Sequence, residues 1–263
     1  RECGQQLLQL AKQRNIAVII IGHLTKEGII AGPKMLEHMV DVVLYIEGDD
    51  RHDHRILRSA KNRFGTSNEV GIFQMESNGL IEVKNPSELF LAERRDDISG
   101  STIFPSLEGS RPILVEVQAL VSNANFGTPQ RNVNGFDFKR LAMLLAVLEK
   151  RLGILMGTKD VFVNLVGGLK IDDPAADLAV ITAVASSARD KLLPKSVILI
   201  GEVGLGGEVR SVSRLDTRIN EAKSLGFKSV IAPTANVKRM KTQPKGIKIS
   251  GVTNVGEAFH LLF

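Results

Sequence analysis

The chain has 263 residues, of which 43% are hydrophobic and 24% are charged, so a globular protein with room for two domains is expected and a disordered chain is not. The formal net charge of +5 is compatible with a nucleic-acid partner but is also common in proteins that bind none. One cysteine, Cys3, excludes an internal disulfide and a cysteine-based zinc site, and no apolar run approaches the roughly 20 residues of a membrane span. Together these features predict a cytoplasmic protein without membrane contact.

The first part of the chain, residues 1–84, follows a strand-rich pattern after an initial helix. Residues 1–14 carry apolar side chains at helical spacing with no start signal before them, so the chain is expected to be a piece of a longer protein. A continuous apolar run at 16–21 predicts a buried strand of a parallel sheet. Later apolar runs, separated by turn residues, predict hairpin strands that extend this sheet antiparallel. These runs are at 40–46, 55–60, 70–75 and 80–83.

The remaining residues predict a linker and a second domain. Between 85 and 111 the apolar periodicity lapses among Pro, Gly, Ser and Asp, which is typical of a linker. From 112 to 263 strands and helices interleave without a repeat. One amphipathic helix is predicted to stop at Gly153 after a row of leucines, and another to begin after Asp173 and Pro174.

A cationic turn is predicted where a strand ends, at Lys61-Asn62-Arg63-Phe64-Gly65. Two cations separated by one residue point to the same side, and Gly65 permits a tight backbone that would hold them against an anion. Arginine can bind two phosphate oxygens at once, whereas lysine acts as a point charge. The alternative is a solvated strand end with ordinary surface charge. For Phe64 two roles remain, a base-stacking platform or a side chain that packs the turn, and we favour packing.

This turn and the stretch 19–28, IIIGHLTKEG, resemble signatures of the RadA (Sms) family of bacterial DNA repair proteins, and the resemblance covers essentially the whole chain. The resemblance implies an α/β fold: the C-terminal part of a RecA-like P-loop ATPase sheet in residues 1–84, then a Lon-protease-like α+β domain of the ribosomal protein S5 domain 2 type in residues 112–263. Family members carry a four-cysteine zinc motif and a Walker A loop ahead of this region. Neither string occurs in this chain, so ATP or ADP with magnesium, and zinc, are expected only in the intact protein, and the chain is expected to be inactive alone.

In the ATPase part, the resemblance implies three catalytic residues. His23 would sense the terminal phosphate, although a lone histidine after an apolar strand is more often a core or edge residue. Lys61 and Arg63 would reach into the nucleotide site of a neighbouring subunit, where such a cation contributes on the order of 10³ to 10⁵ in rate. Residues 25–33 would form a loop close to DNA. The expected DNA contacts in and beside this loop are Lys26, Gly28 and Lys34.

The assembly and partners are also implied by the resemblance. It implies a homo-hexameric ring helicase of the DnaB type that hydrolyses ATP in response to DNA. Its partners would be single-stranded and branched DNA and the RecA recombinase, and its role would be branch migration of recombination intermediates during DNA repair.

The second domain resembles a protease whose chemistry is missing. The string Asp172-Asp173-Pro174-Ala175-Ala176-Asp177 looks like the Lon nucleophile motif D-G-P-S-A-G with alanine at the serine position, and Arg218 falls at the position of the general-base lysine. A methyl group cannot attack a carbonyl, and a guanidinium that stays protonated cannot serve as a base. The resemblance therefore implies a degenerate dyad, Ala175 and Arg218, in a domain that is not a protease.

Basic side chains around these elements are candidates for phosphate contacts, which carry affinity without base specificity. They are Arg131, Arg140, Lys170, Arg210, Arg214 and Arg218. The alternative is scattered charge that only aids solubility. No metal site is predicted. Two other functions remain open, a Lon-like serine peptidase and a purely non-catalytic module for DNA binding or assembly.

Overall fold

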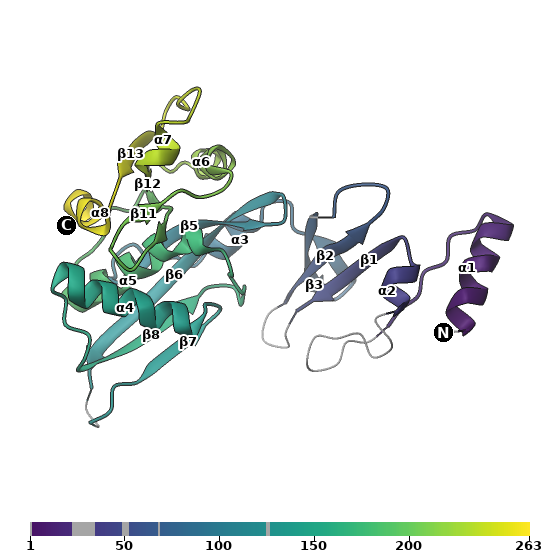
Figure 1. The fold of residues 1–263 in the computed structure, drawn as a ribbon, viewed down its shortest axis with the longest axis horizontal. Helices are drawn as coiled ribbons and strands as arrows, with labels where there is room; N and C mark the ends of the chain where they lie inside the picture. Colours follow the sequence, from purple (N-terminus) through teal and green to yellow (C-terminus); the bar gives the residue numbers. More distant parts are fainter. Residues whose placement is uncertain (1, 23–34, 49–52, 68, 125–126) are drawn as a thin grey trace. The chain divides into compact units, whose positions relative to one another are not determined.

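The computed structural model describes residues 2–22, 35–48, 53–67, 69–124 and 127–263 (Figure 1). The chain divides into two compact units, Arg1–Glu82 (unit 1) and Val83–Phe263 (unit 2). The division falls two residues before the domain end expected at 84.

In its described residues, unit 1 contains two helices and one antiparallel sheet. The helices are α1 (Glu2–Arg14) and α2 (Met35–Met39). Four strands follow and pair in the order β1-β2-β3-β4, each antiparallel to the next. Their bounds are β1 (Val42–Glu47), β2 (His54–Asn62), β3 (Val70–Glu76) and β4 (Gly79–Glu82). The predicted hairpin strands are therefore confirmed, including the tight β3–β4 connection, where Gly79 has a φ of +117°.

The apolar run at 16–21 does not form the buried strand that was predicted. These residues lie in no helix or strand, and Ile19 and Ile21 are 88% and 90% exposed. A buried parallel strand needs a hydrogen-bonded neighbour on each side. No strand among the described residues of unit 1 pairs with this run, so the prediction is wrong for this structure.

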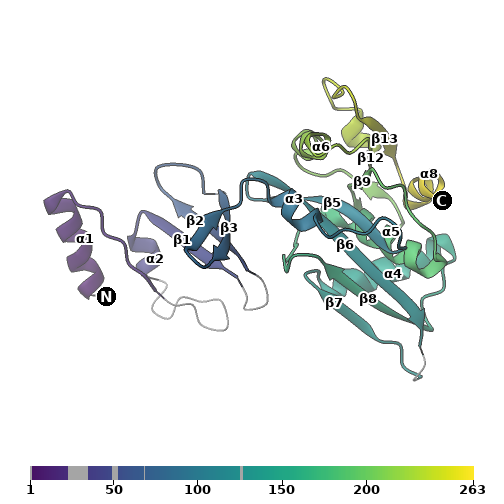
Figure 2. The same ribbon diagram turned by 180° about the vertical axis from the view of Figure 1, so that it is seen from behind.

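Unit 2 is built on a mixed seven-stranded sheet with the order β13-β12-β9-β5-β6-β8-β7 (Figure 2). Its strands are β5 (Ser101–Glu108), β6 (Arg111–Asn123), β7 (Arg131–Asn134), β8 (Lys159–Leu165), β9 (Val197–Leu199), β12 (Ser229–Pro233) and β13 (Lys248–Val252). The pairs β5–β6 and β6–β8 are antiparallel and the other four are parallel. Strands β10 (Glu202–Val203) and β11 (Val209–Arg210) form a separate antiparallel pair. The expected α/β fold class is confirmed.

Helices of unit 2 bury the apolar residues of this sheet. They are α3 (Pro86–Leu91), α4 (Phe138–Leu152), the 3₁₀ turn η1 (Pro174–Ala176), α5 (Asp177–Arg189), α6 (Leu215–Ser224), α7 (Thr234–Val237) and α8 (Val255–Leu262). Helix α5 packs against β5 and β6, and α4 packs against α5. Helix α4 ends at Gly153, as predicted, because this glycine adopts the left-handed conformation with a φ of +65°.

The predicted linker at 85–111 is wrong, because this segment contains α3 and β5 and belongs to unit 2. Strand β5 pairs with β6 along its whole length. The apolar periodicity of β5 lapses because polar residues of this strand are also buried. Their side chains form hydrogen bonds inside unit 2. Ser101 donates to Glu116 and Thr102 donates to the carbonyl of Ala179. A strand buried on both faces does not show the alternation on which the sequence argument depended.

No helix in the described ranges has both the length and the apolar character needed to cross a membrane.

Candidate functional site

Lys61, in the last two residues of β2, lies against helix α2. Its Nζ atom donates to three backbone carbonyls, those of Glu37 at 2.8 Å, His38 at 3.1 Å and Val40 at 2.8 Å. These carbonyls lie at or just beyond the C-terminal end of α2, where helix carbonyls have no partner within the helix. The ammonium group of Lys61 is therefore engaged within its own unit.

Arg63 and Phe64 are more exposed. The guanidinium of Arg63 lies 3.0 Å from a carboxylate oxygen of Asp41, and its side chain is 57% exposed. Phe64 is 83% exposed, so the prediction that it packs the turn is wrong. The structure thus separates the two predicted catalytic cations, since one caps a helix and the other lies on the surface.

The other predicted residues of the ATPase part, His23, Lys26, Gly28 and Lys34, lie outside the described residues.

In unit 2, the fold connects the two positions of the degenerate dyad through one carboxylate. Asp173 accepts a hydrogen bond from the backbone N–H of Ala175 at 3.0 Å, as the N-cap of η1. The other oxygen of the same carboxylate forms an ion pair with Arg218. Ala175 and Arg218, 43 positions apart in the sequence, are therefore held by a common partner, the carboxylate of Asp173.

Arg218 is completely buried. Its Nε atom donates to the carbonyl of Ser213 and its Nη1 atom to that of Pro105, and the guanidinium carbon lies 5.4 Å from the centre of the Phe104 ring. Burial lowers the pKa of Arg218, and the carboxylate of Asp173 acts in the opposite direction. A side chain without exposed surface cannot contact DNA, so Arg218 is not retained among the DNA-contact candidates.

A second ion pair, between Arg140 and Asp177, lies at the start of α5. Asp177 is fully buried and accepts hydrogen bonds from Arg140 and from the backbone N–H of Val203 at 2.9 Å. The hydrogen bond to Asp177 raises the pKa of Arg140. Arg140 therefore joins α4 to α5 instead of offering its charge to a ligand. Sequence reasoning missed this pair, and the one available signal was Asp177 at the last glycine position of the Lon motif.

The remaining predicted DNA contacts fall into two groups. Arg131 is engaged internally, because it donates to the carbonyls of Met156 and Lys159. Lys170, Arg210 and Arg214 are exposed. Arg210 pairs with Glu208, and Arg214 donates weakly to the carbonyl of Gly109. These three are the most exposed of the unit 2 candidates.

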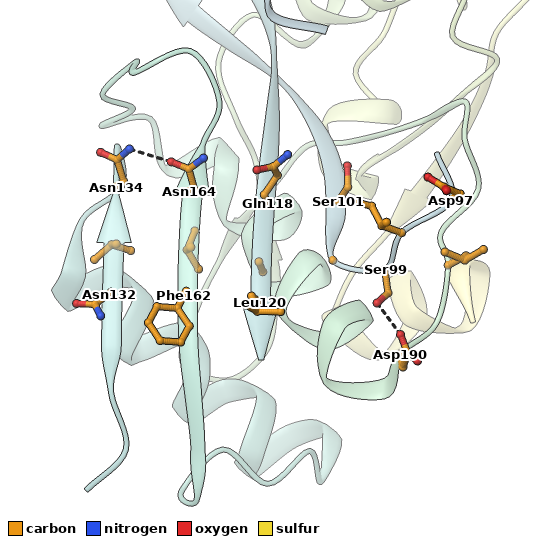
Figure 3. A pocket seen from close by; sticks show the side chains of 16 residues that line it. Asp97, Ser99, Ser101, Gln118, Leu120, Asn132, Asn134, Phe162, Asn164 and Asp190 are labelled. Carbon is orange, nitrogen blue, oxygen red and sulfur yellow. Dashed lines mark hydrogen bonds between the residues drawn. The ribbon is translucent and has the colours of Figure 1, made fainter. Parts of the chain in front are cut away.

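A cavity of about 920 Å³ lies over one face of the unit 2 sheet (Figure 3). Side-chain amides from neighbouring strands line it, and those of Asn134 and Asn164 are joined by a hydrogen bond. Phe162 and Leu120 lie beside them, and Ser99 is bonded to Asp190 at another edge. The described lining contains no lysine or arginine. The sequence analysis did not find this cavity, and its chemistry does not suit a phosphate.

Within the described ranges, no group of three or more His, Cys, Asp or Glu side chains is arranged to hold a metal ion.

Comparison with known proteins gives two findings. The family described as "Lon protease (S16) C-terminal proteolytic domain" matches residues 155–261. The DNA repair protein RadA of Bacillus subtilis strain 168 is 54% identical over 258 residues, which are 98% of this chain and 56% of that protein. RadA of Listeria monocytogenes is 52% identical over 258 residues, which are again 98% of this chain and 56% of that protein. RadA of Streptococcus pneumoniae strain R6 is 51% identical over the whole of this chain, which corresponds to 62% of that protein.

The chain thus spans little more than half the length of these relatives. The Lon-type match lies entirely within unit 2, which agrees with the division of the fold. The resemblance to the DNA repair proteins RadA is therefore confirmed over essentially the whole chain, with a Lon-like domain in its second unit.

Proposed function

We propose that the intact protein is a DNA-dependent ATPase that translocates on DNA and promotes branch migration in recombinational repair. This chain would supply the end of its RecA-like core and a Lon-like domain. The observation that carries the proposal is the 54% identity over 258 residues to a protein named for DNA repair. ATP with magnesium would bind in the intact protein, zinc would bind in a segment outside this chain, and a hexamer would act with RecA on single-stranded and branched DNA in the cytoplasm.

Within this proposal, Arg63 is the cation that enters a neighbour's nucleotide site. Its partner in the chain is Asp41, and both side chains are substantially exposed. Exposed pairs of this kind contribute only about 0 to 1 kcal/mol, so the guanidinium can exchange Asp41 for a phosphate at little cost. A guanidinium can also bind two phosphate oxygens at once, which suits the charge that develops on a transferred phosphoryl group.

DNA-stimulated ATP hydrolysis by the intact protein tests this role. Arg63→Ala is expected to lower the rate by about 10³-fold or more. The matched control is Arg58→Ala, which removes an arginine of the same sheet that pairs with Glu47, and it is expected to stay near the wild-type rate. An unchanged rate in Arg63→Ala would remove the assignment.

A mixing experiment separates action within a subunit from action on a neighbour. Arg63→Ala subunits are mixed with subunits that cannot bind ATP. If Arg63 acts on a neighbour, the mixture recovers part of the hydrolysis that each variant lacks alone. No recovery, in assemblies shown to be mixed, would contradict action in trans.

The Lon-like domain is proposed to be proteolytically inactive, against the alternative of a serine peptidase. Ala175 offers no nucleophile, and the buried guanidinium of Arg218 is held by Asp173. Covalent labelling of the purified chain by a serine-directed phosphonate would support the peptidase instead.

For the chain alone, we propose DNA binding without catalysis. The exposed cations Lys170, Arg210 and Arg214 support a phosphate contact. Filter binding to single-stranded DNA across a salt series is the test. Replacing all three by glutamine is expected to reduce both the affinity and the steepness of its salt dependence. A salt dependence that stays the same would argue against this surface.

A further inference from the structure

One face of the unit 2 sheet lines the cavity with a row of side-chain amides (Figure 3). Gln118 of β6 lies opposite Asn164 of β8, and Asn164 lies opposite Asn134 of β7. Residues paired across neighbouring strands share a face of the sheet, so this amide row crosses the strands at intervals of about 4.8 Å. Each amide carries an oxygen that accepts hydrogen bonds. The amide row therefore offers a line of acceptors to a ligand that lies across the sheet.

Beside the amide row, the same face is apolar. Leu120 of β6 lies opposite Phe162 of β8. Leu120 is 62% exposed, and Phe162 is partly exposed. A hydrocarbon chain placed here would remove apolar surface from water, and an aromatic ring attracts a cation that lies over its face. This pair suits a ligand that is apolar along its length and positively charged.

Two carboxylates, Asp97 and Asp190, lie at the β5 end of the cavity, across the sheet from Asn134 (Figure 3). Asp190 is the C-cap of α5, and its carboxylate accepts a hydrogen bond from Ser99 at 2.8 Å. A cation is favoured here, because the last carbonyls of a helix carry partial negative charge. Asp97 pairs with Arg95, but these side chains are 67% and 66% exposed, so a ligand can replace Arg95 at little cost in free energy.

The charges of the lining favour a cation over an anion. The described lining contains no lysine or arginine, although the chain carries a formal net charge of +5. An anion would meet the two carboxylates without a compensating cation. An uncharged ligand would contact the amide row and the apolar pair but would gain nothing from the carboxylates. A flexible methylene chain with an ammonium group at each end uses all three parts of the cavity.

We propose that this cavity binds a linear aliphatic polyamine of the length of spermidine. One terminal ammonium group binds Asp97 and Asp190, the methylene groups lie over Leu120 and Phe162, and the other terminal ammonium group donates to the amide row. None of the described lining residues belongs to the degenerate dyad. The proposal does not depend on the activity proposed for the intact protein.

The spacing of the strands sets the length of the ligand. From β5 to β7 the sheet spans three strand intervals, or about 14 Å. Extended spermidine reaches about 11 Å between its terminal nitrogens, and a hydrogen bond of about 2.9 Å at each end completes the distance. Putrescine, a shorter diamine, reaches only about 6 Å. It can therefore occupy one end of the cavity but not both.

Calorimetric titration of the chain, without nucleic acid, tests the length and the charge of the ligand. Spermidine is expected to bind at one site, about tenfold or more tightly than putrescine, because only spermidine forms charged hydrogen bonds at both ends. The matched control is 1,8-octanediol, which has the length of spermidine without its charge and is expected not to bind at the same concentrations. Equal affinity for the two amines, or binding of the diol, would overturn the proposal.

The variant Asp190→Asn tests where spermidine binds. Asparagine tolerates the left-handed conformation of this position, where φ is +47°, so the fold is kept. The affinity for spermidine is expected to fall about tenfold or more, because a hydrogen bond to a charged acceptor becomes a neutral one. The matched control, Asp216→Asn, removes an exposed carboxylate of α6 outside the lining and is expected to leave the affinity unchanged. Equal weakening in both variants would mean that spermidine responds only to net charge, which would overturn the site.

Nuclear magnetic resonance of the side-chain amides tests the other end of the cavity. Spermidine is expected to shift the signals of Gln118, Asn134 and Asn164 in the wild-type chain, and to shift them less in Asp190→Asn at the same concentration. Signals that stay in place at saturating spermidine would contradict binding across the sheet and overturn the proposal.

A tetralysine peptide distinguishes a free polyamine from a protein partner, because lysine side chains carry the same alkylammonium groups. Tetralysine is expected to bind more weakly than spermidine, since its ammonium groups branch from a backbone that the cavity has to exclude. Tighter binding of tetralysine, with shifts of the same amide signals, would instead identify a docking site for a basic protein segment and overturn the assignment to a polyamine.

Discussion

Two arginines from the two units, Arg63 and Arg218, show how differently one residue type can be used. Each forms an ion pair with an aspartate, Arg63 with Asp41 and Arg218 with Asp173. The side chain of Arg63 is 57% exposed, whereas that of Arg218 has no exposed surface. Burial therefore separates a cation that can change partners from one that cannot.

The reason is electrostatic. In water an exposed pair is screened and contributes little, so exchanging its partner changes the free energy little. A buried guanidinium that loses its carboxylate stays desolvated and unpaired, so it is held in place. Under the proposed function, an arginine at a motif position serves a reaction in unit 1, whereas the arginine that replaces the Lon lysine stabilises the fold of unit 2.

Removing the buried cation is expected to have the largest effect. Arg218→Met should reduce the free energy of unfolding by about 3 to 5 kcal/mol, because Asp173 is left without its partner. Urea unfolding of the chain measures this, with the exposed Arg210→Met as control. A loss no larger than that of the control would show that the buried pair does not hold this region together.

Arg140→Ala should have the next largest effect, since it leaves the carboxylate of Asp177 buried with only the N–H of Val203 as partner. We expect a loss of about 2 kcal/mol, because Arg140 itself is partly exposed and hydrogen bonds to charged groups contribute about 1.5 to 3 kcal/mol. The same unfolding measurement applies. A change near zero would contradict the link from α4 to α5.

Arg63→Met should change the stability of unit 1 by less than about 1 kcal/mol, as for other exposed pairs. Unfolding followed by a probe placed in unit 1 is the measurement. A loss as large as that of Arg218→Met would mean that Arg63 is structural, and the contrast between the two arginines would disappear.

Restoring the protease residues alone is expected to have no effect. In Ala175→Ser with Arg218→Lys, the new ammonium would lie beside the carboxylate of Asp173, which favours its protonated form and so prevents it from acting as a base. A serine-directed phosphonate should therefore not label the double variant. Adding Asp173→Gly, the residue type of the Lon motif, removes this obstacle. Labelling of the double variant would contradict the role given to Asp173.

Local patterns were sufficient for several elements. The hairpin strands of unit 1 and the end of α4 at Gly153 follow from turn residues, apolar runs and a glycine stop, which act over a few positions. The short strings around Lys61 and Ala175 were likewise sufficient to identify the relatives. Motifs of this kind can be read directly because all their residues are consecutive.

Partners and burial could not be read in this way, because they depend on residues far apart in the chain. Lys61 finds its carbonyls 21 to 24 positions away, and Arg218 finds Asp173 at a separation of 45. Strand β5 was taken for a linker because its buried hydroxyl groups are satisfied by β6 and α5. The packing of these distant segments decides which cation is buried and which is exposed. Desolvation of a charge depends on all of its neighbours in space, whereas a sequence pattern records only neighbours along the chain.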